Sequence, residues 1–161
     1  MGVLLVQLSE QCVLITGGAR GLGHHLSLAF AREGAQVIIN YHRSAQAAQA
    51  LAAQLGPRQA IALQADVTDP AQVQAMLATA AGHFGRPLTT VVNNALAAFS
   101  FNGDARPKAD AIGWDAFQSQ FEGSVRGALN TVQAALPAMR AQRFGRVINI
   151  GTNLFQNPVV P

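Results

Sequence analysis

Two places in the sequence bring together residues that could do chemistry. The segment TGGARGLG carries Gly17, Gly21 and Gly23 in the spacing G-x-x-x-G-x-G. Glycines let the backbone turn tightly and come close to a phosphate, and a helix that starts there offers unpaired N–H groups and a partial positive charge. Much later, Thr152 follows the apolar run RVINI and a glycine, so its hydroxyl stands where a buried strand opens into a loop. The first place predicts a pyrophosphate site, and the second predicts a site for a reacting group.

Short apolar strands alternate with helical segments between these two places. Strands are expected at residues 12–16, 35–40, 60–65, 89–93 and 146–150. Helices are expected at residues 21–33, at 45–55 after an N-cap at Ser44, from 69–70 onward, and from about 114 to 141, with Pro137 weakening the last turn. Parallel strands must be joined by such crossovers, and their apolar character is typical of a sheet that is covered on both faces.

The expected fold class is α/β, with a doubly wound parallel sheet of the Rossmann type over a single domain, residues 1–161. The strand order should be 3-2-1-4-5, and the sheet should end after its fifth strand. Ligands bind such sheets beyond the carboxyl ends of the strands, where the order reverses. The turns after Thr16, Asn40, Ala65 and Asn93 should therefore surround one crevice.

Four further segments carry a resemblance to a known family. They are DVTD at residues 66–69, NNAL at 93–96, GALNTVQAALPAM at 127–139 and GRVINIGT at 145–152. Together with the glycine segment they resemble the short-chain dehydrogenases/reductases over essentially the whole chain, and within them most of all the 3-oxoacyl-acyl-carrier-protein reductases of fatty acid biosynthesis. The resemblance implies a cytoplasmic oxidoreductase that reduces a small or carrier-bound carbonyl compound, such as a 3-oxoacyl thioester, to the hydroxy form.

The resemblance also implies which residues contact the dinucleotide. They are Gly17, Ala19, Arg20, Gly21, Leu22, Gly23, Asn40, Arg43, Asp66, Val67, Asn94, Ala95 and Leu96. An acidic residue at the end of the second strand would bind both ribose hydroxyls and repel a 2′-phosphate, but this chain has Asn40 there. Arg20 and Arg43 suit a phosphate instead, so we predict NADP(H) rather than NAD(H). Two alternatives stay open: a glycine-rich turn without a ligand, and an Arg43 that only lies in a solvated loop.

For catalysis, the resemblance implies a Tyr that donates a proton, a Lys four residues later, a Ser that binds the carbonyl oxygen, and an Asn that supports a water relay. Thr152 occupies the Ser position and Ser124 the Asn position, while Leu96 replaces a glycine near the nicotinamide ribose. The chain has one tyrosine, Tyr41, and one lysine, Lys108, far from the required spacing. We therefore expect the catalytic Tyr and Lys outside this chain. The alternatives are an inactive dinucleotide-binding module and a fragment without function.

Other classes of function receive little support from the sequence. The net charge is only +3 and the arginines are scattered, which disfavours nucleic-acid binding. No uninterrupted apolar run is long enough for a membrane span. Cys12 is the only cysteine and is expected as a buried thiol. The adjacent His24 and His25 should face different directions and His42 and His83 are scattered, so the histidines predict no metal site. The resemblance implies a dimer or tetramer for the complete family form, and assembly of this chain stays open.

Overall fold

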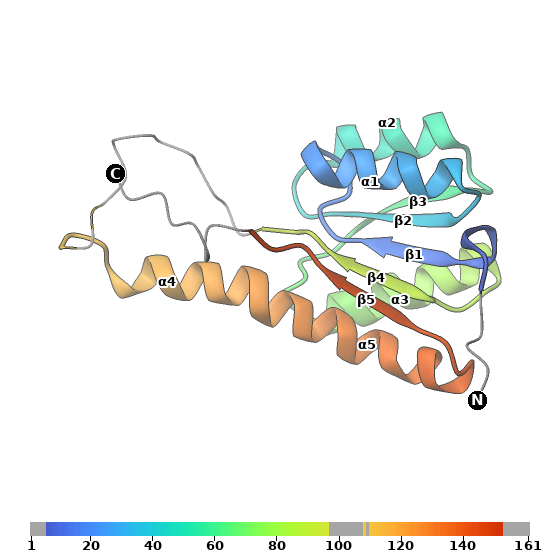
Figure 1. Cartoon of the computed structure of the whole chain (residues 1–161). Coiled ribbons are helices and arrows are strands. Elements are labelled where there is room, and N and C mark those ends of the chain that lie inside the picture. The colour runs from blue at the N-terminus through green and yellow to red at the C-terminus, as the bar shows by residue number, and fades with distance from the viewer. Residues whose placement is uncertain (1–5, 97–107, 109, 153–161) are drawn as a thin grey trace.

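Five parallel strands form one sheet in the order β3-β2-β1-β4-β5, which confirms the predicted topology (Figure 1). The computed structural model describes residues 6–96, 108 and 110–152. The strands are β1 (Cys12–Ile15), β2 (Gln36–Tyr41), β3 (Ala60–Gln64), β4 (Thr90–Asn93) and β5 (Arg146–Asn149). The helical elements are η1 (Leu8–Glu10), α1 (Gly21–Arg32), α2 (Ala45–Leu55), α3 (Pro70–Phe84), α4 (Trp114–Phe121), η3 (Glu122–Arg126) and α5 (Gly127–Ala141). Each strand boundary lies within one residue of its predicted position.

β1 lies at the centre of the sheet because it pairs with β2 on one side and with β4 on the other. Cys12 pairs with Gln36, and Val13 with Thr90. All pairs are parallel, so the carboxyl ends of the strands meet at one edge of the sheet. The strand order reverses between β1 and β4, as predicted, so the expected crevice lies beyond the carboxyl ends of these two strands.

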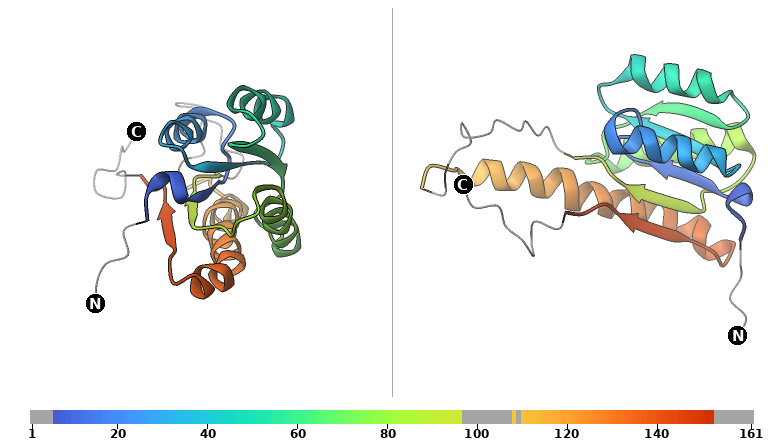
Figure 2. Two further views of the ribbon diagram at one scale, coloured as in Figure 1. Left: turned by 90° about the vertical axis from the view of Figure 1, so that its right-hand side faces the viewer. Right: turned by 45° about the horizontal axis from the view of Figure 1, so that its top comes forward.

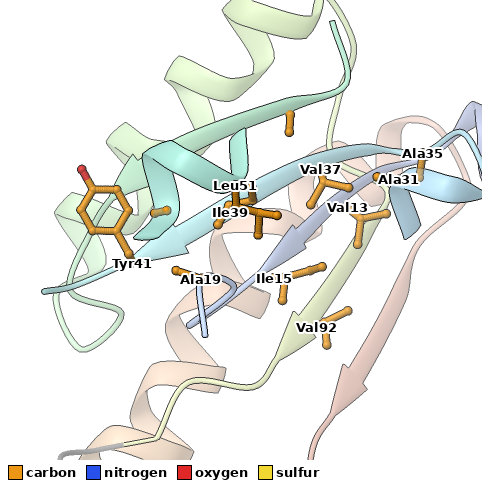
Figure 3. Close-up of a cluster of buried hydrophobic side chains, with 12 residues drawn as sticks. Val13, Ile15, Ala19, Ala31, Ala35, Val37, Ile39, Tyr41, Leu51 and Val92 are labelled. Atoms are coloured by element: carbon orange, nitrogen blue, oxygen red, sulfur yellow. The ribbon is translucent and has the colours of Figure 1, made fainter. Parts of the chain in front are cut away.

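Two apolar layers cover the faces of the sheet. Alternate residues of the central strands point to opposite faces, as the period of two in a strand requires. The layer beneath α1 and α2 contains Val13, Ile15, Val37 and Ile39 (Figure 3). The opposite layer packs against α3 and α5, and its buried members are Cys12, Leu14, Ile38, Ala65, Val73, Met76, Ala80, Leu88, Val91, Ala135 and Met139.

Cys12 is buried, as the sequence predicts. Burial raises the pKa of its thiol to about 12, and the positive charge of Arg86 offsets this only in part. A thiol in that state is a poor nucleophile at neutral pH. Its role is therefore packing.

The first turns of α1, α2 and α3 differ in how they are held. Ser44 is the N-cap residue of α2, as predicted, but its side chain makes no capping hydrogen bond. Asp69 does cap α3, because its carboxylate accepts from the N–H groups of Ala71 and Gln72. Leu22, which continues the apolar stripe of α1 in sequence, is 53% exposed because it lies in the first turn, at the open edge of the sheet.

The long helix spans residues 114–141 as predicted, but the π-helical turn η3 divides it into α4 and α5. Pro137 lies inside α5, and the helix continues to Ala141. α5 packs on the sheet, whereas α4 projects beyond the carboxyl edge (Figure 2). An apolar stripe along the first part of the long helix is largely exposed, at Phe117 and Phe121 of α4, Val125 of η3 and Leu129 of α5.

β5 is not covered on both faces, contrary to the expectation for the strands. As the edge strand it has one neighbour, β4, and its side chains are exposed, with Ile148 at 38%. Among the described residues, no helix is both long and apolar enough to cross a membrane.

The central strand should dominate the stability of the fold. Leu14 is fully buried, so Leu14→Ala should lower the free energy of unfolding by about 2–5 kcal/mol through lost burial and a residual cavity. Leu129→Ala removes the same atoms from an exposed site and should change it by less than about 0.5 kcal/mol. Urea unfolding followed by circular dichroism measures both. Equal losses in the two variants would contradict the placement of the core.

Candidate functional site

The turn after β1 is fastened to the end of β4 by polar side chains. The Thr16 hydroxyl accepts from the backbone N–H groups of Asn94 and Ala95, both at 2.9 Å. The Asn94 amide donates to the carbonyl oxygens of Thr16 at 2.9 Å and of Gly17 at 3.3 Å. A Cβ on Gly23 would collide with the carbonyl oxygen of Gly17 and with this amide. Only glycine therefore fits at position 23.

Asn40 holds the same turn from the other side. Gly17 N–H donates to its side-chain oxygen at 3.3 Å, and its side-chain N–H₂ donates to the carbonyl oxygen of Ala65 at 3.1 Å. Gly18 N–H donates to the Asn40 backbone carbonyl at 2.9 Å. Asn40 is only 2% exposed. Its side chain thus ties the glycine turn to the ends of β2 and β3, inside the protein.

The start of α1 is open to an anion. Its N-cap residue, Arg20, provides no side-chain cap, and the first turn contains no acidic residue. Gly21 has φ +53° and no atom within 4 Å of the position of a Cβ, so the space above it is free. Ser27 holds the turn from below by donating to the carbonyl oxygens of Gly18 and Gly23. Backbone N–H groups at such a helix start attract a phosphate, so these residues fit the pyrophosphate of a dinucleotide.

At the ends of β2 and β3 lies a group of charged and polar residues. Burial alone would raise the pKa of Asp66, but hydrogen bonds from the Thr68 N–H and hydroxyl outweigh it, and His42 acts in the same direction. The pKa of Asp66 is therefore below its ordinary value. His42 Nε2 lies 3.9 Å from Oδ2 of Asp66. Arg43, the next residue in the chain, is exposed.

A cavity of about 280 Å³ lies between the ends of β1, β4 and β5 and the long helix. Ser124, in the π-helical turn η3, lines it together with Leu96, Val67 and Ala95. The structure thus brings Ser124 to the same cavity as three residues predicted to contact the dinucleotide. π-helical turns inside α-helices occur frequently at functional sites, and this one agrees with that tendency.

A polar chain borders the same cavity, and the sequence analysis did not assign it. The Thr131 hydroxyl donates to Oδ1 of Asn93 at 2.7 Å, and Nδ2 of Asn93 donates to Oδ1 of Asn149 at 2.9 Å. Asn93 and Asn149 both line the cavity, at the ends of β4 and β5. Their position as polar residues closing two apolar strands was the available signal.

The remaining candidates lie apart from the cavity lining. Thr152 is exposed two residues beyond Ile150, which is the last cavity residue along β5 and its extension. Tyr41 is buried in the apolar layer beneath α1 and α2, on the other side of the sheet from α5 (Figure 3). Lys108 is exposed and does not line the cavity. Tyr41 therefore cannot donate a proton to a group in this cavity.

Known proteins share both this sequence and this arrangement. A family model described as short chain dehydrogenase matches residues 11–160. Hydroxynaphthalene reductase arp2 of Aspergillus fumigatus is 45% identical over 89 residues, which are 54% of this chain and 32% of that protein. The 3-oxoacyl-acyl-carrier-protein reductase FabG of Staphylococcus aureus is 33% identical over 141 residues, which are 86% of this chain and 54% of that protein. The chain thus spans about half or less of the length of these curated relatives.

Among solved structures, the serine dehydrogenase from Escherichia coli is similar, with a TM-score of 0.78 and 26% sequence identity. The match covers 93% of this chain and 66% of that chain.

The close contact at Gly23 can be tested by adding one methyl group. Gly23→Ala should lower the free energy of unfolding by about 1–3 kcal/mol, because the carbonyl of Gly17 and the Asn94 amide must both move. Gly82→Ala in α3 is the control, because no atom lies within 4 Å of its Cβ position. That variant should be stabilised by up to about 1 kcal/mol, since alanine favours a helix interior. Chemical unfolding of both variants measures these changes in the free energy of unfolding. Equal changes in the two variants would contradict the close contact at Gly23.

The hydroxyl of Thr68 should control the ionisation of Asp66. Thr68→Val removes one hydrogen bond to the carboxylate, so the pKa of Asp66 should rise. Because its pKa in the folded protein is lowered, Asp66 stabilises the fold above the ordinary carboxyl pKa, and this contribution is lost as the pH falls through the lowered value. A carbon-detected NMR titration of the carboxyl group measures the shift. Thr79→Val, which alters a hydroxyl bonded within α3, should leave Asp66 unchanged.

Proposed function

The chain belongs to the short-chain dehydrogenase family, and from this premise we propose that it forms the dinucleotide-binding portion of an NADP(H)-dependent carbonyl reductase. One observation carries the proposal. The start of α1 has no side-chain cap, no carboxylate in its first turn, and free space above Gly21. Such a site accepts the phosphates of a dinucleotide and would otherwise leave backbone N–H groups unpaired.

The proposed contacts follow the carboxyl edge of the sheet. The pyrophosphate would lie on the N–H groups of Gly21, Leu22 and Gly23. Asp66 and Val67 would border the adenine, and Asn94, Ala95 and Leu96 the nicotinamide side. Asn40 would act indirectly, because its amide holds the turn that carries Gly17.

We propose NADP(H) rather than NAD(H) because two cationic side chains lie in the loops that follow β1 and β2. Arg43 follows β2, and Arg20 precedes α1. Both are exposed, so their guanidinium groups are available to a 2′-phosphate, which Arg can bind through two hydrogen bonds.

The proposed reaction reduces a ketone, such as that of a 3-oxoacyl thioester, to the hydroxy form. The name of the FabG relative supports this substrate class. The bound nicotinamide would supply the hydride to the carbonyl carbon. Thr152 would donate a hydrogen bond to the carbonyl oxygen, and Ser124 would orient a water molecule in the cavity that it lines. The proton for the oxygen would come from a Tyr-Lys pair outside these 161 residues, because Tyr41 is buried elsewhere.

The burial of Tyr41 favours one alternative, a dinucleotide-binding module that lacks catalysis of its own. It predicts binding of NADPH without turnover of any ketone. For assembly, we propose a dimer or tetramer of the complete enzyme, in the cytoplasm. The exposed apolar stripe of the long helix, with Phe117, Phe121, Val125 and Leu129, supports contact with another surface.

Isothermal titration calorimetry with NADPH and NADH tests the proposed function. We expect NADPH to bind more tightly, and Arg43→Gln to weaken NADPH about tenfold, the effect of one charge-assisted hydrogen bond, while NADH changes little. Arg58→Gln is the matched control. Arg58 is exposed and precedes β3, so it lies at the amino ends of the strands, away from the proposed site at their carboxyl ends. Failure of both nucleotides to bind the folded wild-type protein would refute the proposal.

A further inference from the structure

Two neighbouring buried residues of α5 reach different strand ends at the carboxyl edge of the sheet. Asn130 is only 8% exposed, and Thr131 is fully buried. Consecutive residues of a helix point about 100° apart, so the two side chains leave α5 in different directions. A buried amide or hydroxyl without a partner is costly, and each of these two finds a partner outside α5.

Asn130 fixes the loop that follows β3. Its Nδ2 atom donates a hydrogen bond to the carbonyl oxygen of Val67 at 2.9 Å. Gly127, at the start of the same helix, packs against the same residue, because a Cβ there would lie only 2.8 Å from Cγ2 of Val67. The loop after β3 is thus held on α5 both by a hydrogen bond and by close packing.

Thr131 fixes the ends of β4 and β5. Its hydroxyl oxygen lies 2.7 Å from Oδ1 of Asn93 and 2.9 Å from the carbonyl oxygen of Ala128. A hydroxyl has a single hydrogen, and a carbonyl inside α5 also accepts from the helix backbone. The hydroxyl hydrogen therefore goes to Asn93. This turns Nδ2 of the Asn93 amide toward Oδ1 of Asn149, at 2.9 Å.

The two contacts reach opposite halves of the proposed dinucleotide site. Val67 is proposed to border the adenine, and the residues that follow Asn93 are proposed to border the nicotinamide. Val67 and Asn93 both line the cavity, whereas Asn130 and Thr131 are not among the described residues that line it. The two buried residues can therefore affect a ligand only through the parts of the chain that they hold.

We propose that Asn130 and Thr131 are positioning residues for different halves of the dinucleotide. Asn130 holds the adenine half of the site through Val67, and Thr131 holds the nicotinamide half through Asn93. The inference rests on the proposed binding of NADP(H) and deepens it. A pair that only held α5 on the sheet would affect both halves of the ligand alike.

The expected effect follows from the cost of ordering a loosened segment. Without the amide of Asn130, the carbonyl of Val67 loses its donor, and the loop after β3 can take other positions. Without the hydroxyl of Thr131, the same holds for the amide of Asn93 and the end of β4. Binding must then restore the original arrangement, which lowers the affinity for the half of the ligand that lies against that segment.

The test is calorimetric titration of the folded 161-residue protein with NADPH and with 2′-phospho-ADP-ribose, which lacks the nicotinamide. The ratio of the two dissociation constants then reports what the nicotinamide adds to binding. Asn130→Leu should weaken both ligands by the same factor, roughly threefold to tenfold as for one lost hydrogen bond, and leave the ratio unchanged. Thr131→Val should weaken NADPH by a similar factor and leave 2′-phospho-ADP-ribose unchanged.

Three further variants separate positioning from packing. Thr131→Ser keeps the hydroxyl but loses the methyl group, so it should keep the wild-type ratio. Asn130→Ala, which cannot overfill its site, should reproduce the effect of Asn130→Leu. Gln133→Leu is the matched control, because Gln133 is an exposed amide of the same helix, and it should change neither dissociation constant. Urea unfolding of each variant measures stability separately from binding.

The contrary outcomes are distinct. Equal effects of Asn130→Leu and Thr131→Val on the ratio, or no effect of either on binding, would overturn the inference while the proposed function stands. Equal dissociation constants of the two ligands in the wild type would overturn the role of Thr131, because the nicotinamide would then add nothing to binding. Failure of both ligands to bind the folded wild type would overturn the proposed function, and the inference with it.

Discussion

The site depends on how the backbone is satisfied where β1 ends. Beyond Ile15 the chain turns away from its neighbours, so the ladder hydrogen bonds of the sheet stop while the backbone is still buried. Side chains provide the missing partners there. The Thr16 hydroxyl accepts hydrogen bonds from two backbone N–H groups after β4, and the Asn94 amide donates to two carbonyl oxygens. The side-chain oxygen of Asn40 accepts a hydrogen bond from the N–H of Gly17. Buried polar groups without partners are costly, so these bonds fix the turn in a single shape.

The rigid turn after β1 is combined with exposed surfaces on β5 and on the long helix. The layers beneath α1, α2, α3 and α5 are closed, with the central strands fully buried. By contrast, β5 and the stripe on α4 and α5 remain exposed. Stability and preorganisation are thus concentrated at β1, β2 and β4, where the dinucleotide is proposed to bind. β5 and the exposed stripe of the long helix, which border the proposed substrate site, make fewer packing contacts within the described residues.

The sequence allowed the sheet to be predicted almost completely, because runs such as CVLI and QVIINY have no other stable place than a covered parallel sheet. Local side-chain choices were harder to predict. Ser44 and Asp69 are both good capping residues, yet only Asp69 caps, because capping depends on backbone angles that composition does not encode. The π-helical turn at Ser124 leaves no pattern in the sequence at all. The polar chain through Asn93 was also missed, since its members lie far apart in sequence and meet only in the folded protein.

The position of Asn40 limits how cofactor preference can change in evolution. The oxygen of its side-chain amide accepts a hydrogen bond from the Gly17 N–H, and the nitrogen donates one to the carbonyl oxygen of Ala65. An aspartate there could still accept, but it has no N–H to donate, so the carbonyl of Ala65 would face a carboxylate oxygen. The substitution that introduces an acidic residue at the end of β2 would therefore disturb the turn where the pyrophosphate is proposed to bind. Starting from the proposed preference for NADP(H), a lineage descending from this sequence would reach a preference for NAD(H) more readily through the exposed positions that follow β2, such as His42 and Arg43.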